Sequence, residues 1–235
     1  MDRKTLESYK EQYKDDLFKK VLPFWVNNGL DKKFGGIDTC LDRNGNVFSA
    51  EKSVWMQGRG GWLFAHLVNT FGPNEAFKTI AESALDFTKQ YCIDPADGRL
   101  YFVVSSDGTP VRKRRYCFSE HFYIMANAEY YTLSHQEEYL EEAKKYHRLV
   151  LDIWKDPAND PFKITPKFLP TAPAMRGLCS DLVLMLVTRT MRVNDPDNVE
   201  KYEALERTLI DNVVGYHYHE AIGTLLENVA PNGNY

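Results

Sequence analysis

The sequence has few cysteines, no long apolar run and no apolar segment near its N-terminus. Its four cysteines are dozens of residues apart and form no C-x-x-C pair, which excludes a disulfide framework and indicates reduced, buried thiols. The longest apolar run, 182–187, is far shorter than the ~20 residues of a membrane-spanning helix. The N-terminus lacks the apolar core of a secretory signal. We therefore expect a soluble, cytoplasmic protein that does not associate with membranes.

Basic residues are not in excess, and the common catalytic signatures are missing. Lys and Arg number 29 against 33 Asp and Glu, a net charge of −4, and the only basic cluster is 112–115. A nucleic-acid-binding protein would need a basic face, so we expect no such partner. The chain has no G-x-G-x-x-G, Walker A, H-E-x-x-H or G-x-S-x-G motif. His217 and His219 have no nearby carboxylate or thiol cluster, so we expect no metal site.

Helical periodicity dominates a chain of 235 residues that is 43% hydrophobic. This length and composition suit one globular domain over residues 1–235. The pattern of apolar residues predicts helices over 4–28, 53–71, 74–91, 118–133, 136–154, 173–192 and 198–214. The fold class expected is therefore all-α.

Turn signals recur between the predicted helices at a nearly constant interval. Asn-Gly or Asp-Gly pairs occur in 41–47, 104–111 and 230–235, and such pairs favour tight hairpin turns. Gly45 and Gly108 are 63 residues apart, and Gly108 and Gly233 are 125 apart, about twice the first interval. This period predicts helical hairpins that stack or close into a ring, with a degenerate third turn near 162–167. Because 230–235 begins a hairpin without completing it, we expect the N-terminal part of a longer protein.

One face of the helix predicted over 53–71 carries side chains that suit a sugar. At about 100° per residue, Trp55, Arg59, Trp62 and His66 fall on a single stripe. Indole rings can cover the C–H face of a sugar, and the arginine fork can donate to its oxygens. A surface stack of the two indoles on the guanidinium is the alternative.

Three glycines surround Arg59 in the same predicted helix, at positions 58, 60 and 61. Each interior glycine costs roughly 0.8–1 kcal/mol relative to alanine. We expect them to lower the side-chain profile so that a ligand or a neighbouring helix can approach the backbone.

The helix predicted over 118–133 carries a second polar stripe. Glu120, Tyr123, Asn127 and Tyr131 share one of its sides. Such a stripe suits a hydrated ligand and equally suits a solvated helix face. His121 lies off this stripe, and a packed or solvated histidine is the simpler interpretation.

The segments VWMQGR (54–59), FSEHFY (118–123) and FWVNNGLDKKFGGIDTCLDRNGNV (24–47) resemble the N-acylglucosamine 2-epimerase family, which includes the renin-binding proteins. The resemblance runs through essentially the whole chain. It implies an α/α six-barrel, a toroid of helical hairpins with short β-hairpins between the pairs, of which this chain is an incomplete part. It also implies an isomerase that interconverts N-acetylglucosamine and N-acetylmannosamine.

Epimerisation at C2 removes a proton next to an aldehyde and returns it on the opposite face, which needs acid–base groups and a cation for the developing oxyanion. The resemblance assigns the cation to Arg59, and it places the acid–base histidines on later helices, so we expect this chain alone to be inactive. The candidate site is Arg59 as the catalytic residue, with substrate-binding residues Trp55, Gln57, Trp62, Glu120, Tyr123, Asn127 and Met175.

Two departures from the family pattern affect the expected substrate. Gly60 and Gly61 stand where bulkier residues often follow the arginine, which enlarges or loosens the pocket. Thr171 and Met175 stand where cellobiose epimerases and aldose–ketose isomerases commonly have Asn and His, which resembles the N-acyl-sugar branch more.

The resemblance requires no cofactor for the chemistry, allows ATP as an unconsumed allosteric activator, and allows a homodimer. Other free-sugar epimerases or isomerases, of the mannose or cellobiose type, remain alternatives, as do the hydrolases and lyases built on α/α toroids. A protein-binding helical array without catalysis is the non-enzymatic alternative.

Overall fold

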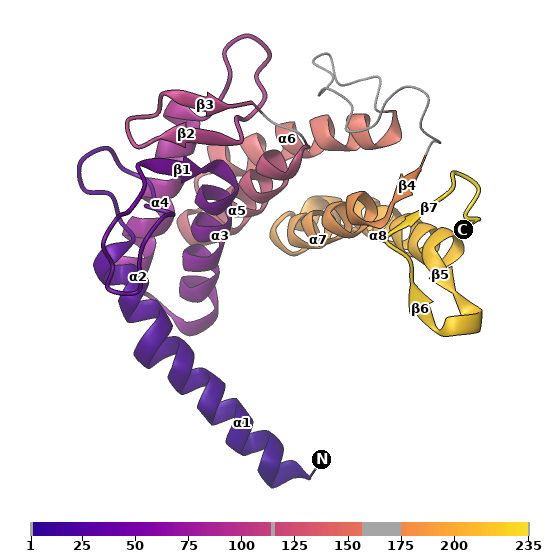
Figure 1. Ribbon diagram of the computed structural model, residues 1–235, viewed down its shortest axis with the longest axis horizontal. Coiled ribbons are helices and arrows are strands. Elements are labelled where there is room, and N and C mark those ends of the chain that lie inside the picture. The colour runs from indigo at the N-terminus through magenta and orange to yellow at the C-terminus, as the bar shows by residue number, and fades with distance from the viewer. Residues whose placement is uncertain (1, 114–115, 157–174, 235) are drawn as a thin grey trace.

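The structure is a computed structural model that describes residues 2–113, 116–156 and 175–234. Helices make up most of it (Figure 1). The helices are α1 (Arg3–Asp16), α2 (Leu22–Asn28), α3 (Val54–Phe71), α4 (Glu75–Tyr91), α5 (Phe118–Ser134), α6 (Glu137–Lys155), α7 (Leu178–Asn194) and α8 (Val199–Asn212). Short π-helical turns lie at η1 (Leu17–Val21) and η4 (Val213–His217), and 3-10 turns at η3 (Pro196–Asn198) and η5 (Glu220–Ile222). The all-α class predicted from periodicity is confirmed.

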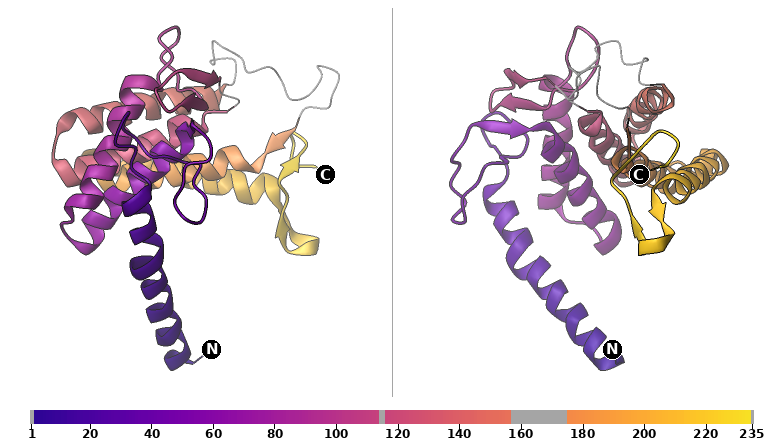
Figure 2. Two further views of the ribbon diagram at one scale, coloured as in Figure 1. Left: turned by 60° about the vertical axis from the view of Figure 1, so that its left-hand side comes forward. Right: turned by 45° about the vertical axis from the view of Figure 1, so that its right-hand side comes forward.

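The long helices form two layers in strict alternation along the chain. Helix α5 packs against α3 on one side and α7 on the other, so these three form one layer. Each pairs with the helix that follows it, α3 with α4, α5 with α6 and α7 with α8 (Figure 2). This is the alternation of inner and outer helices that the hairpin period predicts.

In the part of the chain that the structure describes, seven short strands lie between the helices or follow the last of them. They are β1 (Glu51–Ser53), β2 (Val103–Ser105), β3 (Pro110–Arg112), β4 (Arg176–Gly177), β5 (Tyr218–His219), β6 (Thr224–Leu225) and β7 (Asn228–Val229). In the antiparallel sheet β1–β2–β3, Lys52 is opposite Val104, and Val103 is opposite Arg112. The pair β4–β7 aligns Arg176 with Val229 and so connects the start of α7 to the segment that leads into the turn at Gly233. β5 pairs with β6, placing Tyr218 opposite Leu225.

The three recurring glycine turns adopt the same backbone conformation. Gly45, Gly108 and Gly233 have φ values of 87°, 88° and 86°, which a side chain would disfavour. In each turn the glycine N–H donates to the carbonyl oxygen three residues earlier. The first turn closes on a single bridge, Leu41 to Val47, rather than on full strands. The expected degenerate turn near 162–167 lies outside the described residues.

The helix predicted over 4–28 is interrupted. Helix α1 ends at Asp16, the π-helical turn η1 follows, and α2 resumes at Leu22. Pro23 sits in the first turn of α2, and its ring and missing N–H prevent an unbroken α-helical ladder through this point. Helix α1 buries no residue and extends away from the rest of the molecule (Figure 1).

Cysteine placement corrects part of one expectation. All four cysteines are free thiols, in agreement with the spacing. Only Cys92 is fully buried, and burial raises the pKa of its thiol to about 12. Cys179 is exposed on α7, so the prediction of uniformly buried thiols is wrong there.

The glycines around Arg59 serve the contact between α3 and α5. A Cβ on Gly58 would lie 2.6 Å from the Phe122 carbonyl carbon, and one on Gly61 would lie 3.2 Å from the Ala126 Cβ. A Cβ on Gly60 would meet the Ile37 Cδ1 atom at 2.3 Å. The approach of a neighbouring helix therefore explains Gly58 and Gly61, and the approach of a loop explains Gly60.

Gly58→Ala is expected to destabilise the protein despite the better helix propensity of alanine. The added methyl would meet backbone of α5, which can move only with its whole helix, so we expect a loss of about 1–3 kcal/mol in the free energy of unfolding. Urea denaturation of this variant measures the loss. Gly215→Ala is the matched control, because a Cβ at Gly215 meets nothing within 4 Å. A Gly58→Ala variant as stable as the parent would contradict the close approach.

Within the described residues, no helix is both long enough and apolar enough to cross a membrane.

Candidate functional site

Arg59 is one of the two exposed members of the stripe on α3, and His66 is the other. The Arg59 guanidinium carbon lies 4.7 Å from the ring centre of Phe122 on α5. Within the described part of the chain, Arg59 makes no hydrogen bond or ion pair. A guanidinium held over an aromatic ring keeps its N–H donors available, which suits recognition of ligand oxygens.

Trp55 belongs to an aromatic cluster beside this arginine. Its ring meets those of Phe102, Phe118 and Phe122 at centroid distances of 5.2, 5.3 and 6.2 Å. The first two contacts are edge-to-face, a favourable geometry for aromatic pairs. The segment that leads into β2 holds this end of α3 in place, since the Val54 N–H donates to the Phe102 carbonyl. Half-buried Trp55 thus joins Arg59 and Phe122 in one aromatic wall.

Trp62 stacks on His66 one turn along the same face. The two rings are 5.1 Å apart with an angle of 12° between their planes. One indole face is therefore covered by an imidazole, which reduces the area that a sugar could cover. The stripe is continuous, as periodicity predicts. At one end Trp55 and Arg59 contact aromatic rings of α5, and at the other end Trp62 and His66 stack on each other.

Gln57 is buried and clamps a loop instead of facing the stripe. Its Oε1 accepts from the Ile37 N–H and its Nε2 donates to the Ile37 carbonyl, both at 2.7 Å. Both ends of the amide bond one backbone unit and the residue is only 1% exposed, which argues against direct contact between Gln57 and a substrate. Its contact with the loop supports the wall next to Arg59.

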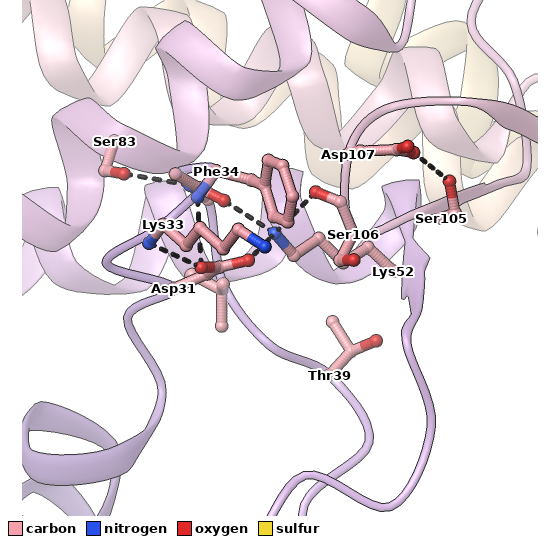
Figure 3. A network of polar contacts seen from close by, with 12 residues as sticks. Asp31, Lys33, Phe34, Thr39, Lys52, Ser83, Ser105, Ser106 and Asp107 are labelled. Atoms are coloured by element: carbon pink, nitrogen blue, oxygen red, sulfur yellow. Dashed lines mark hydrogen bonds and ion pairs between the residues drawn. The ribbon is translucent and has the colours of Figure 1, made fainter.

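The same loop is anchored by a buried lysine, Lys52 of β1 (Figure 3). The Lys52 ammonium lies 2.6 Å from Asp31 Oδ2, and it donates to the carbonyls of Gly35 at 2.7 Å and Ser106 at 3.2 Å. It also lies 4.4 Å above the ring of Phe87. One cation thus connects the loop before β1, the β2–β3 turn and helix α4.

The carboxyl of Asp31 titrates at the low end of its range. Burial by itself would raise its pKa, but the Lys52 hydrogen bond and the N–H groups of Lys33 and Phe34 outweigh burial and lower the pKa. Asp31 is therefore ionised at neutral pH and pairs with the lysine.

The predicted polar stripe on α5 does not form an open ligand face. Glu120 is completely buried, where its Oε1 accepts from Arg99 Nε at 2.6 Å and from the Leu100 N–H at 3.1 Å. Asn127 is buried and donates to the Tyr123 carbonyl at 2.8 Å. Glu120 Oε2 is buried without a hydrogen-bond partner of its own, and the burial of both residues argues against direct contact with a substrate.

Tyr123, a third member of that predicted stripe, faces the outer layer. Its ring packs edge-to-face on Tyr146 of α6 at 5.3 Å, and burial raises its pKa well above the ordinary tyrosine value. The stripe of charged, amide and phenolic groups is therefore an interface between helices. Helical spacing places these residues on one side of α5, but the side is the one covered by α6.

Met175 lies apart from Arg59. The helix predicted over 173–192 begins only at Leu178, because Arg176 and Gly177 pair with β7 as a strand. Met175 is exposed in the segment before that strand, at the edge of a hollow of about 510 Å³ between α6, α7 and α8. Arg59 does not line this hollow, so the two do not share it. Thr171 lies outside the described residues.

Two residues of α5 that contact members of the Arg59 stripe are not among the residues predicted from the sequence. Phe122 supports the guanidinium, and Glu129 accepts a hydrogen bond from His66 Nδ1 at 3.0 Å. Phe118, Phe122 and Glu129 are spaced i, i+4 and i+11, so they share a helix face that periodicity could have shown.

Three of the other histidines, His121, His147 and His217, are buried. Burial lowers the pKa of His121 and of His147 to about 4. The Nδ1 of His217 bonds to the Leu226 carbonyl at 2.9 Å. Over residues 2–113, 116–156 and 175–234, no three His, Cys, Asp or Glu side chains gather closely enough to hold a metal ion.

Alternating helical pairs with short hairpins between them define a protein of the α/α toroid class. The solved structure of cellobiose 2-epimerase from Bacillus thermoamylovorans B4167 has this fold, with a TM-score of 0.84 at 19% identity over 97% of this chain and 61% of that one. The D-mannose isomerase structure gives a TM-score of 0.73 at 14% identity over 100% of this chain and 57% of that one.

A profile of the N-acylglucosamine 2-epimerase (GlcNAc 2-epimerase) family matches residues 35–234, and the chain belongs to that family. It is similar to N-acylglucosamine 2-epimerase of Rattus norvegicus, with 28% identity over 239 residues, 99% of this chain and 55% of the relative. The Homo sapiens enzyme is 29% identical over 238 residues, 99% of this chain and 54% of the relative. The chain thus spans about half the length of the curated relatives it matches. The resemblance seen in the VWMQGR and FSEHFY segments is confirmed.

Proposed function

We propose that this chain provides the arginine wall of a sugar 2-epimerase site, with N-acetylglucosamine and N-acetylmannosamine as the substrates. The observation that carries the proposal is the exposed Arg59 guanidinium, which lies over Phe122 with no hydrogen bond or ion pair to another described residue. Membership of the family supports the reaction class, and the names of the curated relatives support the N-acyl sugars.

Arg59 has a defined role in the proposed chemistry. Removal of the C2 proton next to the open-chain aldehyde leaves an enediolate, whose negative charge lies on oxygen. A preorganised cation stabilises such charge without reorganisation during the reaction. The planar guanidinium can donate two parallel hydrogen bonds to adjacent sugar oxygens, whereas a lysine offers only a point charge.

The 235-residue chain is expected to bind the sugar through Arg59 but not to exchange its C2 proton. Proton transfer needs a base at C2, and of the six histidines in the sequence only His66 shares the stripe of Arg59. It lies seven residues further along α3, roughly 10 Å along the helix axis. Cytoplasmic location, ATP as an unconsumed activator and a homodimer belong to the proposal and rest on the resemblance alone.

The test of this function is a sugar titration of the purified chain and its Arg59→Lys variant. We expect N-acetylmannosamine to raise the melting temperature of the parent chain, and Arg59→Lys to weaken the affinity about tenfold or more, in line with loss of a charge-assisted bidentate contact. Arg189→Lys, on α7, is the control. Equal affinities in parent and Arg59→Lys would remove Arg59 from the site.

The same samples separate the alternatives. Proton NMR in deuterated water follows exchange at C2 of N-acetylmannosamine, with the enzyme-free rate as the baseline. Exchange above that baseline would contradict the expectation that this chain lacks the base. If no monosaccharide binds, that result would favour the protein-binding helical array over a sugar site.

A further inference from the structure

Glu129 is a buried carboxylate on which three successive inner helices converge. Its Oε1 accepts from His66 Nδ1 and Asn69 Nδ2 of α3, both at 3.0 Å. Its Oε2 accepts from Asn194 Nδ2 of α7 at 3.3 Å. The Glu129 side chain itself belongs to α5 and is only 8% exposed.

Burying this carboxylate is costly, and stability alone does not explain it. Among the described residues, no lysine or arginine pairs with Glu129, and His66 is its sole basic neighbour. Well-packed apolar residues usually stabilise such a position as much as or more than a buried charge. A carboxylate does, however, fix the orientation of a ring that donates to it, as in many sites where a histidine must act in one tautomer.

The contact determines which nitrogen of His66 carries the proton. An ionised carboxylate only accepts hydrogen bonds, so Nδ1 must carry the hydrogen that points to Glu129. In the neutral ring Nε2 is then unprotonated and accepts. The nearest described hydroxyl to it, Thr70 Oγ1, lies 3.4 Å away, at the long end of the hydrogen-bond range.

His66 is presented where a ligand on the Arg59 stripe could reach it. Its side chain is 46% exposed although one nitrogen is held by a buried group. One face of the ring is packed on Trp62, which leaves the ring edge and the opposite face accessible. The separation from Arg59 means that His66 would contact a different part of the ligand.

We propose that His66 is a second sugar-contact residue on α3, whose Nε2 accepts a hydrogen bond from a ligand hydroxyl, and that Glu129 is the positioning residue that holds its imidazole in that tautomer. The inference rests on the proposed function and extends it. The shared ligand chemistry is a hydroxyl of a carbohydrate, either at the far end of an open-chain monosaccharide or on the second ring of a disaccharide.

The first measurement is nitrogen NMR of the histidine rings in ¹⁵N-labelled protein at neutral pH. His66 is expected to show a protonated Nδ1 and an unprotonated Nε2. Glu129→Ala removes the acceptor, so the proton should move toward Nε2, whereas Glu129→Gln keeps an amide oxygen for Nδ1 and should retain the parent tautomer. A merely structural Glu129 would leave the tautomer unchanged in all three proteins, and that result overturns its positioning role.

The second measurement is titration with two sugars, N-acetylmannosamine and cellobiose. His66→Phe keeps a ring to stack on Trp62 but removes Nε2, and we expect it to weaken binding of the contacted sugar about three- to tenfold. His135→Asn, at an exposed histidine beyond the end of α5, is the matched control and should bind as the parent does. If His66→Phe loses affinity only for cellobiose, His66 Nε2 contacts the second ring of a disaccharide. If it also loses affinity for N-acetylmannosamine, Nε2 contacts the monosaccharide.

The outcomes separate this inference from the proposed function. Weakened binding in Arg59→Lys together with parental binding in His66→Phe overturns the His66 contact and leaves the function standing. Absence of binding to either sugar by the parent overturns both. If Glu129→Ala does not fold, the ring resonances of Glu129→Gln and the parent still test the tautomer, because a parent with protonated Nε2 contradicts the inference directly.

Discussion

Replacing Lys52 with methionine is expected to lower the free energy of unfolding by about 3–5 kcal/mol, the usual result of breaking a buried ion pair from one side. Methionine fits the space but provides no donor, so Asp31 and the carbonyls of Gly35 and Ser106 lose the ammonium that all three contact. Lys52 is 1% exposed, which prevents water from replacing it without rearrangement. Chemical denaturation at neutral pH, followed by circular dichroism, measures the loss.

Two further variants identify the source of that loss. Lys32→Met changes an exposed lysine in the same loop and should alter stability by less than about 0.5 kcal/mol. Asp31→Asn keeps the side-chain oxygen that accepts from Lys33 and Phe34 but removes the charge. The double variant Lys52→Met with Asp31→Asn should therefore lose less free energy of unfolding than the sum of the losses of the two single variants. Strict additivity would show that the two side chains do not interact.

Acidification from pH 6.5 to pH 4 is expected to destabilise the protein through two buried histidines. Burial lowers the pKa of His121 and of His147 from 6.5 to about 4. Between these pH values the histidines bind protons in the unfolded chain but not in the folded chain. Their contribution to the free energy of unfolding is therefore fully present above pH 6.5 and decreases as the pH falls. A shift of this size corresponds to a loss on the order of 3 kcal/mol for each histidine.

The contribution of one histidine is measured by difference, because other groups also titrate. Burial raises the pKa of Asp38 and Asp86, whose protonation near the acid end acts in the opposite direction. His147→Leu should flatten the dependence of the unfolding free energy on pH between 6.5 and 4. His135→Asn, at an exposed site, should leave that dependence unchanged. Identical slopes for His147→Leu and the parent would mean that folding does not lower the pKa of His147.

The architecture could be predicted because it is encoded in local periodicity. Helical spacing located the long helices, and the recurrence of Gly45, Gly108 and Gly233 located turns that need a positive φ. Both signals depend only on residues close in sequence. The interruption before Pro23 was missed because the apolar pattern continues through it, although the proline itself is a known breaker.

The candidate site was only partly predictable, since helical spacing groups residues on a face without saying what covers that face. The stripe of Arg59 keeps two exposed members, Arg59 and His66, whereas the stripe of Glu120 faces Arg99 and the outer helix α6. Likewise, nothing near Gln57 in sequence indicates that its amide pairs with the backbone of Ile37, 20 residues earlier. These partners are set by tertiary packing, so polar residues that resemble a ligand face turned out to be buried supports.

The sharing of Glu129 among α3, α5 and α7 has a consequence for how the molecule opens. In a stack of helical pairs that touch only their neighbours, each pair could unfold separately, and amide exchange would then proceed at a different rate in each. Glu129 accepts hydrogen bonds from the helices on both sides of α5, so the opening of one helical pair is coupled to the opening of its neighbours. The inner helices should therefore exchange as one cooperative unit, while α1, which buries no residue, exchanges independently and far faster.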